Sequence, residues 1–445
     1  MRRRKDTDQI QGDEQEQSGD DCDLENENLE TEITEGKKNN KKGNSKASEV
    51  TERDPLPRNP VPSGAKSFTA LSWNVNGFRA LVKNNPGSLR HLAEKEQPDL
   101  ICLQETKLQK KDVETMRNLC DRELIPGYES VWSCSTTKKG YSGTAVFFPK
   151  QDEIWAGKEL EQTQSSEPPQ KKSKQTKMSS FLKSKDGNIE SRGKDSDQEA
   201  KAEDDTASCA ALHTIKHSEL KVVGITYGIG DAKHDGEGRA ITVEYEKFFV
   251  VVLYVPNSGQ KLERLQYRLQ EWDQALRVYV RGLEERGKAV VVTGDLNVGH
   301  LDLDIYNVGS KHISKSAGTT PEERSSFSAW LDEGAMVDAF RSLHPEARGA
   351  YTYWSIRNSS ARPSNKGLRL DYFLCSKSLL GNKDLAGEKH PVHPVHPVHP
   401  VHPVHPVHPV HPVHHTLPQV HECYILDKAT VGQSDHCPVG LKLLL

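Results

Sequence analysis

The sequence predicts a domain of the α/β class, in which strands and helices alternate along the chain. Short apolar runs of the kind that form buried strands recur, among them residues 248–254 and 289–293. Between these two runs, residues 261–285 carry large apolar side chains at three- and four-residue steps, which predicts an amphipathic helix. Several apolar runs end abruptly in acidic or amide residues, as in "VVVTGDLNVG" at 290–299. Open α/β sheets bind ligands at strand ends, so this pattern also predicts where a site lies.

The predicted elements follow in order along the chain. A strand in "SFTALSWNVNGFRA" ends in a turn at Asn76 and Gly77, and a helix is expected near Ser88 to Gln97. The runs "DLICLQETK" and "GTAVFFPK" predict the next strands. Further strands are expected in "ELKVVGITYGIGD", "RAITVEY" and "KFFVVVLYVPNSG", before the helix at 261–285 and the strand at 289–293. Strand character returns in the final "HECYILDKATVGQSDHCPVGLKLLL".

The composition argues against several classes of protein. Of the 445 residues 34% are hydrophobic, and the formal net charge is −4, so binding to a polyanion needs local patches or a bound cation. Eight cysteines without a CxxC pair predict a reduced compartment, with neither a structural zinc nor a disulfide framework. No run is long and apolar enough to span a membrane, and the first residues lack a signal-peptide core, so we expect no membrane association.

Three segments have the composition of disordered chain. Residues 1–66 form a charged tail, whose lysines are either a nuclear-import signal or simply solvated. The domain is expected to span residues 67–445, interrupted by a Lys-, Ser- and Gln-rich insertion at 154–217. A second interruption, at 386–416, contains a His-Pro-Val repeat. We interpret the repeat as an expansion in a surface loop, with metal binding by its histidines as the less favoured alternative.

Polar side chains gather at the ends of the predicted strands. They are Asn74, Asn76, Glu105, Tyr254, Asn257, Asp295, Asn297, Asp371, Asp435 and His436. Each has a local explanation as a turn residue or cap, but together they are too many for that explanation alone. Oxygens of Asp, Glu and Asn suit a hard cation such as Mg²⁺, and the added histidine and tyrosine suit hydrolysis of a phosphate ester.

The order and spacing of these motifs resemble those of the exonuclease III-type apurinic/apyrimidinic endonucleases, over residues 68–445 outside the two insertions. The motifs are "LSWNVNGFRA", "LICLQETKL", "GYSGTAVFF", "YGIGDAKHDGEGR", "YVPNSG", "TGDLNVGHLDLDIYN", "AGTTPEERSSF", "RLDYFL" and "SDHCPVGL". Single motifs are shared with DNase I-like nucleases, inositol-phosphate phosphatases and deadenylases, whereas "GIGDAKHDGEGR" together with "AGTTPEER" points to the abasic-site enzymes. The resemblance implies a four-layered α/β sandwich of two packed mixed sheets, with helices outside.

The resemblance also implies a metal site. Glu105 would be the principal ligand of Mg²⁺, for which Mn²⁺ could substitute, with Asn76 and Asp435 near it. The further candidate ligands are Asp295, Asn297 and His436.

Catalytic roles follow from the same resemblance. Asp295, aligned by Asn297, would orient and deprotonate the attacking water, and His436, paired with Asp371, would hold a phosphate oxygen. Asp304 would assist the leaving group. The phosphate cradle would be completed by Tyr254, Asn74 and Asn257.

Recognition of a baseless sugar needs an apolar pocket wall, for which Tyr353 and Leu368 match, with Trp354 behind them or in the core. The candidate phosphate contacts are Arg239, Tyr141, Lys107 and Arg369. Two residues depart from many animal relatives, since Gln260 replaces an arginine and Leu368 a tryptophan. These departures leave the balance of endonuclease and exonuclease activity open. Leu71 stands where mammalian relatives carry a redox-active cysteine, so that activity is not expected.

The insertion contains "QTKMSSFL", whose spacing matches a sliding-clamp (PCNA) binding box. The four box positions are Gln175, Met178, Phe181 and Leu182, and lysines flank them. Such a box forms a short helical turn that inserts its apolar side chains into a pocket of the clamp. Leu182 departs from the usual second aromatic residue, and a chance match in a polar segment is the alternative.

These observations predict a monomeric, Mg²⁺-dependent enzyme of base-excision repair that cuts duplex DNA at abasic sites, with 3′-exonuclease and 3′-phosphodiesterase activity in addition. We expect it in the nucleus, and an organellar pool stays open. The alternatives are a catalytically weak adaptor that binds DNA or the clamp with the same fold, and a phosphatase acting on inositol or lipid phosphates. Retention of Glu105, Asp295, Asp371 and His436 favours the enzyme.

Overall fold

The computed structural model describes residues 51–151, 219–333, 336–381 and 417–445. Two six-stranded sheets account for the strands of this part of the chain. Sheet A has the order β11 (Gln419–Ile425), β12 (Val439–Leu444), β1 (Ser67–Asn74), β2 (Leu100–Gln104), β4 (Thr144–Pro149) and β3 (Tyr128–Ser133). Sheet B has the order β5 (Val222–Tyr227), β6 (Ala240–Tyr245), β7 (Phe248–Tyr254), β8 (Ala289–Asp295), β10 (Asp371–Ser376) and β9 (Met336–Asp338).

Both sheets are mixed. In sheet A, β1 and β2 are parallel and the remaining neighbours antiparallel, and in sheet B the parallel pair is β7 and β8. A parallel pair needs a crossover, and here helices supply it. On the sheet A side these are α1 (Phe78–Asn84) and α2 (Ser88–Glu96), followed later by α3 (Lys110–Leu119) and the π-helix η1 (Cys120–Leu124).

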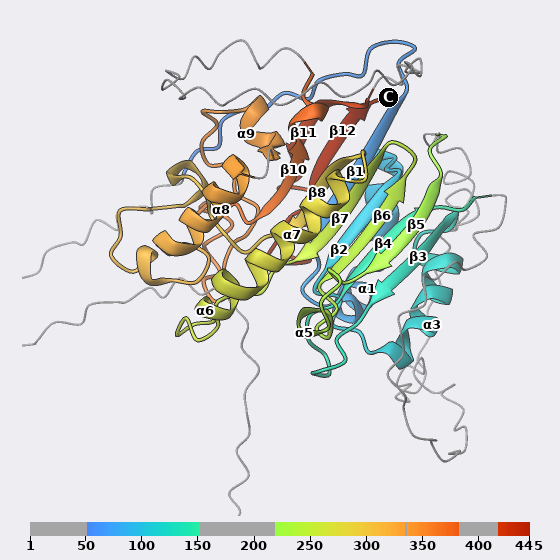
Figure 1. Ribbon diagram of the computed structural model, residues 1–445. Helices are drawn as coiled ribbons and strands as arrows, with labels where there is room; N and C mark the ends of the chain where they lie inside the picture. Colours follow the sequence, from blue (N-terminus) through green and yellow to red (C-terminus); the bar gives the residue numbers. More distant parts are fainter. Residues whose placement is uncertain (1–50, 152–218, 334–335, 382–416) are drawn as a thin grey trace, which may run out of the picture.

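The helices of the second half are α5 (Ala232–Asp235), α6 (Leu265–Tyr267), the π-helix η2 (Arg268–Trp272), α7 (Asp273–Glu284), α8 (Pro321–Glu333) and α9 (Ala339–Leu343). Among them, α7 and α8 cover sheet B, and α9 packs against β10 and β11 near one edge of each sheet. Short 3₁₀ turns occur at η3 (Asp302–Asp304), η4 (Ile313–Lys315) and η5 (Lys377–Leu379). Figure 1 shows α7 lying across the strands of sheet B, with α8 beside it. No helix within the described ranges is long and apolar enough to cross a membrane.

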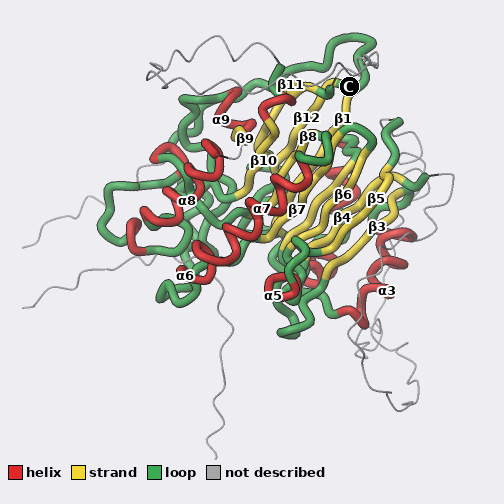
Figure 2. The backbone as a smooth tube through the Cα atoms, viewed as in Figure 1, coloured by secondary structure: helices red, strands yellow, loops and turns green. Residues whose placement is uncertain are grey.

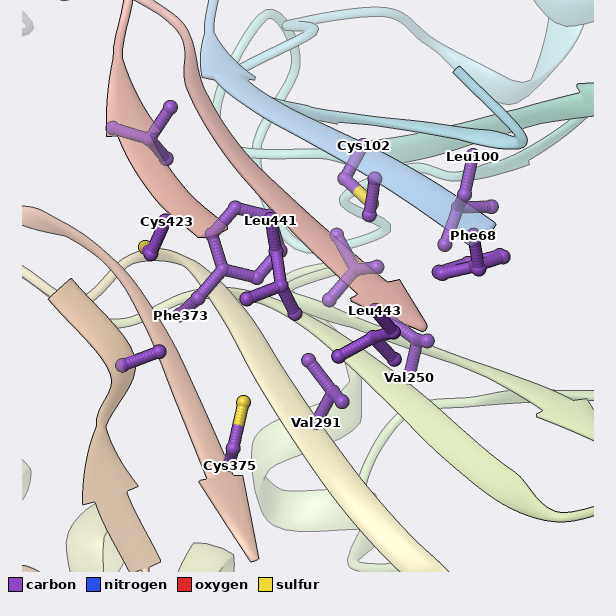
Figure 3. Close-up of a cluster of buried hydrophobic side chains, with 14 of the residues drawn as sticks. Phe68, Leu100, Cys102, Val250, Val291, Phe373, Cys375, Cys423, Leu441 and Leu443 are labelled. Atoms are coloured by element: carbon purple, nitrogen blue, oxygen red, sulfur yellow. The ribbon is translucent and has the colours of Figure 1, made fainter. Parts of the chain in front are cut away.

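Three apolar clusters hold four layers together. The largest lies between the sheets, where Phe68 and Leu443 of sheet A pack with Val250 and Phe373 of sheet B (Figure 3). A second cluster joins sheet A to α1, α2 and η1, and a third joins sheet B to α7 and α8. Strand β7 contributes to both sides, because its successive side chains point to opposite faces and all of them are buried. The predicted α/β sandwich with two packed mixed sheets is confirmed (Figure 2).

The helix predicted at 261–285 differs from the observed one in its first half. The observed helix begins at Leu265, and the π-turn η2 interrupts it before α7. A π-turn adds a residue to one turn and rotates the face that follows. Arg268 and Trp272 are therefore buried, while Leu265 and Leu269 are only half-buried. In the second half the predicted stripe is confirmed, with Leu276, Val280 and Leu283 in the core.

Residues 51–66 are in contact with the domain, although the sequence placed them in the charged tail. Arg58 lies over the ring of Tyr424, 3.3 Å from its centroid, and its Nε donates to Glu422 Oε1 at 2.6 Å. Arg53 pairs with Asp427 at 2.6 Å. The folded part thus begins earlier than the composition indicates, because a few specific pairings compensate for the low apolar content. Residues 1–50, the insertion at 154–217 and the repeat loop at 386–416 lie outside the described residues.

Candidate active site

The predicted site residues converge at one end of the two sheets. In sheet B, Tyr254 at the end of β7 and Asp371 at the start of β10 are the strand partners of Asp295, which ends β8. In sheet A, Asn74 ends β1 beside Gln104, and Glu105 follows directly. The parallel neighbours bring their carboxyl ends to the same edge, which is why residues far apart in sequence meet here.

Gly294 permits the close approach of β7 and β8 at this edge. Its φ is 138°, and a Cβ atom at this position would lie 1.8 Å from the carbonyl oxygen of Leu253. Every side chain would collide there, so only glycine allows the next residue, Asp295, to reach its place. This close approach explains why the "TGDLN" segment carries a glycine at position 294.

The side chain of Asn74 connects the two sheets. Its Nδ2 donates to Glu105 Oε1 at 2.8 Å and to Asp295 Oδ2 at 2.9 Å, while its Oδ1 accepts from the backbone N–H of Asn76 at 3.0 Å. Asn74 is fully buried. One carboxamide thus fixes a carboxylate of sheet A relative to a carboxylate of sheet B.

The backbone around the site adopts left-handed conformations. The φ angles are 46° at Asn76, 52° at Glu105, 53° at Lys107 and 49° at Asn297. Asparagine tolerates this region, whereas glutamate and lysine there cost about 1–3 kcal/mol each. Such strain persists where the surroundings impose it, and it is concentrated at functional sites.

His436 lies between two carboxylates. Its Nδ1 is 2.8 Å from Asp371 Oδ2, and its Nε2 is 3.8 Å from Asp295 Oδ2. Burial would lower the pKa of His436, but Asp371 and then Asp295 outweigh it and raise the pKa to about 10. His436 is therefore an imidazolium at neutral pH. The backbone N–H of Asp371 donates to Thr352 Oγ1 at 3.1 Å, which holds the carboxylate in place.

The carboxyl group of Asp295 has a raised pKa. Burial, the lowering effect of His436 and the raising effects of Asp371 and Glu105 together bring this pKa to about 7. The backbone N–H of Asn297 donates to Asp295 Oδ1 at 2.9 Å. A carboxylate with a pKa near neutrality is suited to accept a proton from water.

A second oxygen cluster lies in sheet A. Asn76 Nδ2 donates to Asp435 Oδ1 at 3.1 Å, and Lys107 Nζ donates to Asn76 Oδ1 at 2.7 Å and pairs with Glu105 Oε2 at 2.9 Å. Burial would raise the pKa of Glu105, but Lys107 and Asn74 lower it below the ordinary value. The ammonium of Lys107 lies between the Asn76 carboxamide oxygen and the Glu105 carboxylate, so these oxygens already bind a positive charge. These oxygens are ligands that suit Mg²⁺, so the residues fit a divalent ion.

Sheet B supplies a further group that could hold a metal. One ligand atom from each of Asp295, Asp371 and His436 lies within 4.8 Å of the others. The oxygen of Asn297 accepts from Asn257 Nδ2 at 3.1 Å, and its Nδ2 donates to the carbonyl of Val255 at 2.9 Å. Asn297 therefore links neighbouring loops in addition to aligning Asp295.

Arg239 supports the tyrosines of the site and is too buried to contact DNA as predicted. It is 1% exposed, and its guanidinium lies 4.6 Å from the centroid of the Tyr254 ring. One of its nitrogens donates to Tyr141 Oη at 2.6 Å and another to Glu237 at 2.5 Å. Burial next to these partners leaves the guanidinium no path to a phosphate. Its effect on binding would pass through Tyr141 and Tyr254.

Arg369 and Asp304 belong to a buried ion-pair network, which differs from the roles predicted for them. Asp304 Oδ1 accepts from Arg369 at 2.7 Å and from Arg341, and Arg369 also pairs with Asp338 at 2.7 Å. Burial would raise the pKa of Asp304, but Arg369 and Arg341 lower it to about 2. A carboxylate with this pKa carries no proton for a leaving group at neutral pH. Arg369, 1% exposed, is likewise not placed to contact a phosphate.

The expected pocket wall lies beside the imidazolium. The Tyr353 ring centroid is 4.9 Å from that of His436, and the backbone of Tyr353 is bridged to both Leu368 and His436. Tyr353 and Leu368 form a small apolar cluster with Ile305 and Ile313. Trp354 belongs to the core between the sheets, which agrees with the core interpretation of this residue.

Sequence reasoning did not identify several residues that hold the site. Arg268 and Glu323 are buried behind it, and Ser258 and Thr352 fix its loops. The signal that could have found Glu323 is the Thr-Pro-Glu-Glu segment of "AGTTPEER", which has the form of a capping box. The clamp-box residues 175–182 lie outside the described residues.

Comparison with known proteins gives a consistent picture. The sequence matches the endonuclease/exonuclease/phosphatase family over residues 71–151 and 198–435. It is 35% identical over 310 residues to an exodeoxyribonuclease of Bacillus subtilis (strain 168), covering 69% of this chain and 88% of the relative. It is 34% identical over 317 residues to DNA repair nuclease APEX1 of Danio rerio, covering 71% and 75%. The structure is similar to that of the AP endonuclease LMAP from Leishmania major, with a TM-score of 0.58, 25% identity and coverage of 88% and 93%.

Proposed function

The chain belongs to the endonuclease/exonuclease/phosphatase family, and from its site we propose that it is a metal-dependent DNA repair nuclease that incises duplex DNA 5′ to abasic sites. The observation that carries this proposal is the meeting of a near-neutral carboxyl, Asp295, with the imidazolium of His436 beside an oxygen cluster. A base, a fixed cation and a cation site are the parts that hydrolysis of a phosphodiester requires. Its relatives bear the names of DNA repair nucleases.

Asp295 acts as the general base. It takes a proton from the attacking water, which the Asn297 N–H helps to align by fixing Oδ1. His436 donates from Nε2 to a phosphoryl oxygen, because its Nδ1 is held by Asp371. Attack at phosphorus breaks the bond to the 3′-oxygen, which takes a proton from solvent water, so the products are a 3′-hydroxyl and a 5′-deoxyribose phosphate. Tyr254, with Asn74 and Asn257, completes the phosphate cradle.

A bound Mg²⁺, or Mn²⁺ in its place, would supply positive charge to the phosphoryl oxygens. Glu105, Asn76 and Asp435 are the residues proposed to hold it, because oxygens of Glu105 and Asn76 accept the ammonium of Lys107 and Asp435 adjoins Asn76. Asp295 and Asn297 are further candidate ligands, and His436 could bind a metal only as the neutral imidazole. The oxygens of Glu105, Asn76 and Asp435 are hard ligands of the kind that suits Mg²⁺.

Selection of an abasic site depends on the wall formed by Tyr353 and Leu368. A base would collide with this wall, while a baseless sugar would fit against it. Leu368 is smaller than the tryptophan of many animal relatives, and Gln260 carries no charge. Exonuclease and 3′-phosphodiesterase activity are therefore part of the proposal, since a less restrictive wall admits other 3′ ends.

The test is incision of a labelled duplex that carries one tetrahydrofuran abasic analogue, with Mg²⁺ and with EDTA. The full chain is expected to cut on the 5′ side with Mg²⁺ alone, and Asp295→Asn, which preserves the shape of the side chain, is expected to lose this cutting. An inositol phosphate serves as the competing substrate. Faster release of phosphate from that substrate, or no cutting by well-folded chain with Mg²⁺, would refute the proposal in favour of the phosphatase or the adaptor.

We further propose that residues 175–182 bind a sliding clamp, with Gln175, Met178, Phe181 and Leu182 as contacts. Met178, Phe181 and Leu182 are apolar, and the box is flanked by lysines that would be attracted to an acidic partner. Calorimetry with a peptide of residues 168–188 tests this, and the absence of heat at high micromolar clamp would refute it. We also propose that the chain is a monomer and that it acts in the nucleus, where binding to the clamp and cutting of DNA would both take place.

A further inference from the structure

We propose that Arg268 is a positioning residue that holds together the two loops carrying Asn257 and the pair Asp295 and Asn297. This inference rests on the function proposed above and concerns how the same site keeps its geometry. Arg268 touches none of the groups assigned to substrate or metal. Its effect would pass through the backbone of the loops that carry those groups.

The guanidinium of Arg268 binds both loops from behind. One of its nitrogens donates to the carbonyl of Pro256 at 3.3 Å and to that of Asn297 at 2.5 Å, and the other donates to the carbonyl of Leu296 at 2.7 Å. Arg268 is 3% exposed. Three carbonyls from two loops thus share one planar, rigid cation, which lysine cannot replace with the same geometry.

These carbonyls adjoin the functional side chains. Pro256 precedes Asn257, and Leu296 lies between Asp295 and Asn297. The loops are joined in front by the contact of Asn257 Nδ2 with Asn297 Oδ1 at 3.1 Å. Arg268 joins them at the back. Its removal would leave the Asn257–Asn297 contact, the Asn297 bond to the Val255 carbonyl and the backbone bond from Val255 N–H to the Asp295 carbonyl, and it would free the carbonyls of Pro256, Leu296 and Asn297.

Glu323 balances the buried charge and ties it to the first loop. Its Oε1 is 3.4 Å from Arg268 and accepts from Ser258 Oγ at 2.5 Å. Its Oε2 accepts from the N–H of Thr320 at 3.2 Å and from Thr320 Oγ1 at 2.9 Å. Since Glu323 N–H donates to Thr320 Oγ1 in return, the start of α8 is a capping box that aims the carboxylate inward. The "TTPEE" part of the sequence motif therefore orients Glu323 toward Arg268.

Helical spacing places Arg268 on the buried face of its helix. It lies three residues after Leu265 and four residues before Trp272, so it belongs to the same face as these two side chains. Arg268 is also the first residue of the π-turn η2, and π-turns are frequent at functional sites.

A neighbouring arginine provides a matched control. Arg277 and Arg268 line the same small cavity of about 20 Å³, together with Asp273 and Glu323. Arg277 donates to Ser326 of α8 at 2.6 Å and is 3.8 Å from Glu333. It therefore packs in the same region, but its hydrogen bonds and ion pair go to α8 and not to the two loops, so its loss should affect stability alone.

The experiment compares Arg268→Lys and Arg277→Lys in the full chain, using kcat and KM on the abasic duplex at saturating Mg²⁺. We expect Arg268→Lys to lower kcat on the order of 10²-fold with KM within about threefold, because small misplacements of reacting groups have effects of this size. Arg277→Lys is expected to retain kcat. Hydrogen exchange by mass spectrometry should show faster exchange at residues 255–259 and 296–299 in Arg268→Lys alone.

Chemical rescue separates positioning from general stability. Millimolar guanidinium is expected to restore part of kcat to Arg268→Ala and none to Asp295→Asn. If Arg268 variants do not fold, Ser258→Ala provides the milder test, with a smaller fall in kcat at an unchanged melting temperature. Equal kcat in wild type and Arg268→Lys, or exchange that does not change in the two loops, would overturn the proposal. A wild type that cuts nothing would instead refute the proposed function. The hydrogen-exchange measurement would then still decide whether Arg268 holds the two loops together.

Discussion

The Nδ1 atom of His436 lies 2.8 Å from Oδ2 of Asp371, and both side chains are buried at the meeting point of the sheets. Burial acts to lower the pKa of the imidazole, but the two neighbouring carboxylates outweigh it and raise the pKa to about 10. The imidazole of His436 therefore keeps its positive charge throughout the neutral range, and its second nitrogen, Nε2, lies 3.8 Å from Oδ2 of Asp295.

Asp371→Asn is expected to lower the pKa of His436, because it removes the nearest carboxylate and leaves burial in force. In the wild type the stabilisation from this histidine is complete below its unfolded pKa, near 6.5, and is lost as pH rises toward about 10. Histidine-selective NMR titration of metal-free protein should show the shift. Incision should fall by about 10²-fold or more. An unchanged imidazole titration would contradict the assignment of the charge to Asp371.

The incision rate is expected to depend on pH through Asp295. The base form of a carboxyl with a pKa of about 7 declines as pH falls, so the rate should drop about tenfold per unit below that pKa. His436→Gln should move this limb to higher pH, because it removes the cation that lowers the pKa of Asp295. Single-turnover rates between pH 5 and pH 9 measure both. A limb that stays in place in His436→Gln would argue against coupling of the two groups.

Asp304→Asn should unfold more easily, and its loss of activity should follow its loss of structure. Removing one charge leaves the buried guanidiniums of Arg341 and Arg369 insufficiently paired, which costs about 3–5 kcal/mol. Urea unfolding measures the cost. The matched variant Asp302→Asn loses an exposed pair with Arg324 and should change stability by about 0–1 kcal/mol. Normal stability with a large fall in kcat would restore the leaving-group role to Asp304.

Lys107→Met is expected to strengthen binding of Mg²⁺ to the DNA-free protein. The ammonium competes for the oxygens of Glu105 and Asn76, so its removal leaves them available to the ion. Calorimetric titration with Mg²⁺ measures the change. Lys111→Met, an exposed lysine of α3, is the control for net charge. Weaker binding in Lys107→Met than in the control would exclude competition.

Two truncations should differ in stability. A chain that starts at residue 51 keeps Arg58 on Tyr424 and Glu422, whereas a chain that starts at residue 67 leaves the carboxylate of Glu422, which is 3% exposed, without this partner. We expect the first to retain the full melting temperature and the second to lose at least a few degrees. Thermal unfolding followed by circular dichroism checks this. Equal melting temperatures would mean that residues 51–66 add nothing to the fold.

Sequence patterns predicted the strands and their polar ends because both depend on local spacing. The abrupt ends of the apolar runs pointed to Asp295 and Asn297, and the strand ends and family motifs also included Glu105 and His436. The patterns did not predict that Arg239 and Arg369 would be buried. The sequence around an arginine does not show whether its side chain is exposed to solvent or paired with a distant carboxylate, as Arg369 is with Asp304. The burial of Arg268 depends on the carbonyls of Asn297 and Leu296 and on Glu323, which come from distant segments and leave no mark in the apolar period of its own helix. Burial of charge is set by tertiary packing, and the pattern of a single segment does not record it.

The route of the chain between the sheets has a practical consequence. Strands β1 to β4 belong to sheet A, the chain crosses to sheet B between β4 and β5, and β11 and β12 return to sheet A after β10. Asn74 and Glu105 therefore precede the crossing, while Asp295 and His436 follow it. A protease cut within the crossing would divide the catalytic groups between two fragments, neither of which could work alone. Mixing the fragments would regenerate activity only as the sheets reassociate, which makes this enzyme a natural candidate for a split reporter.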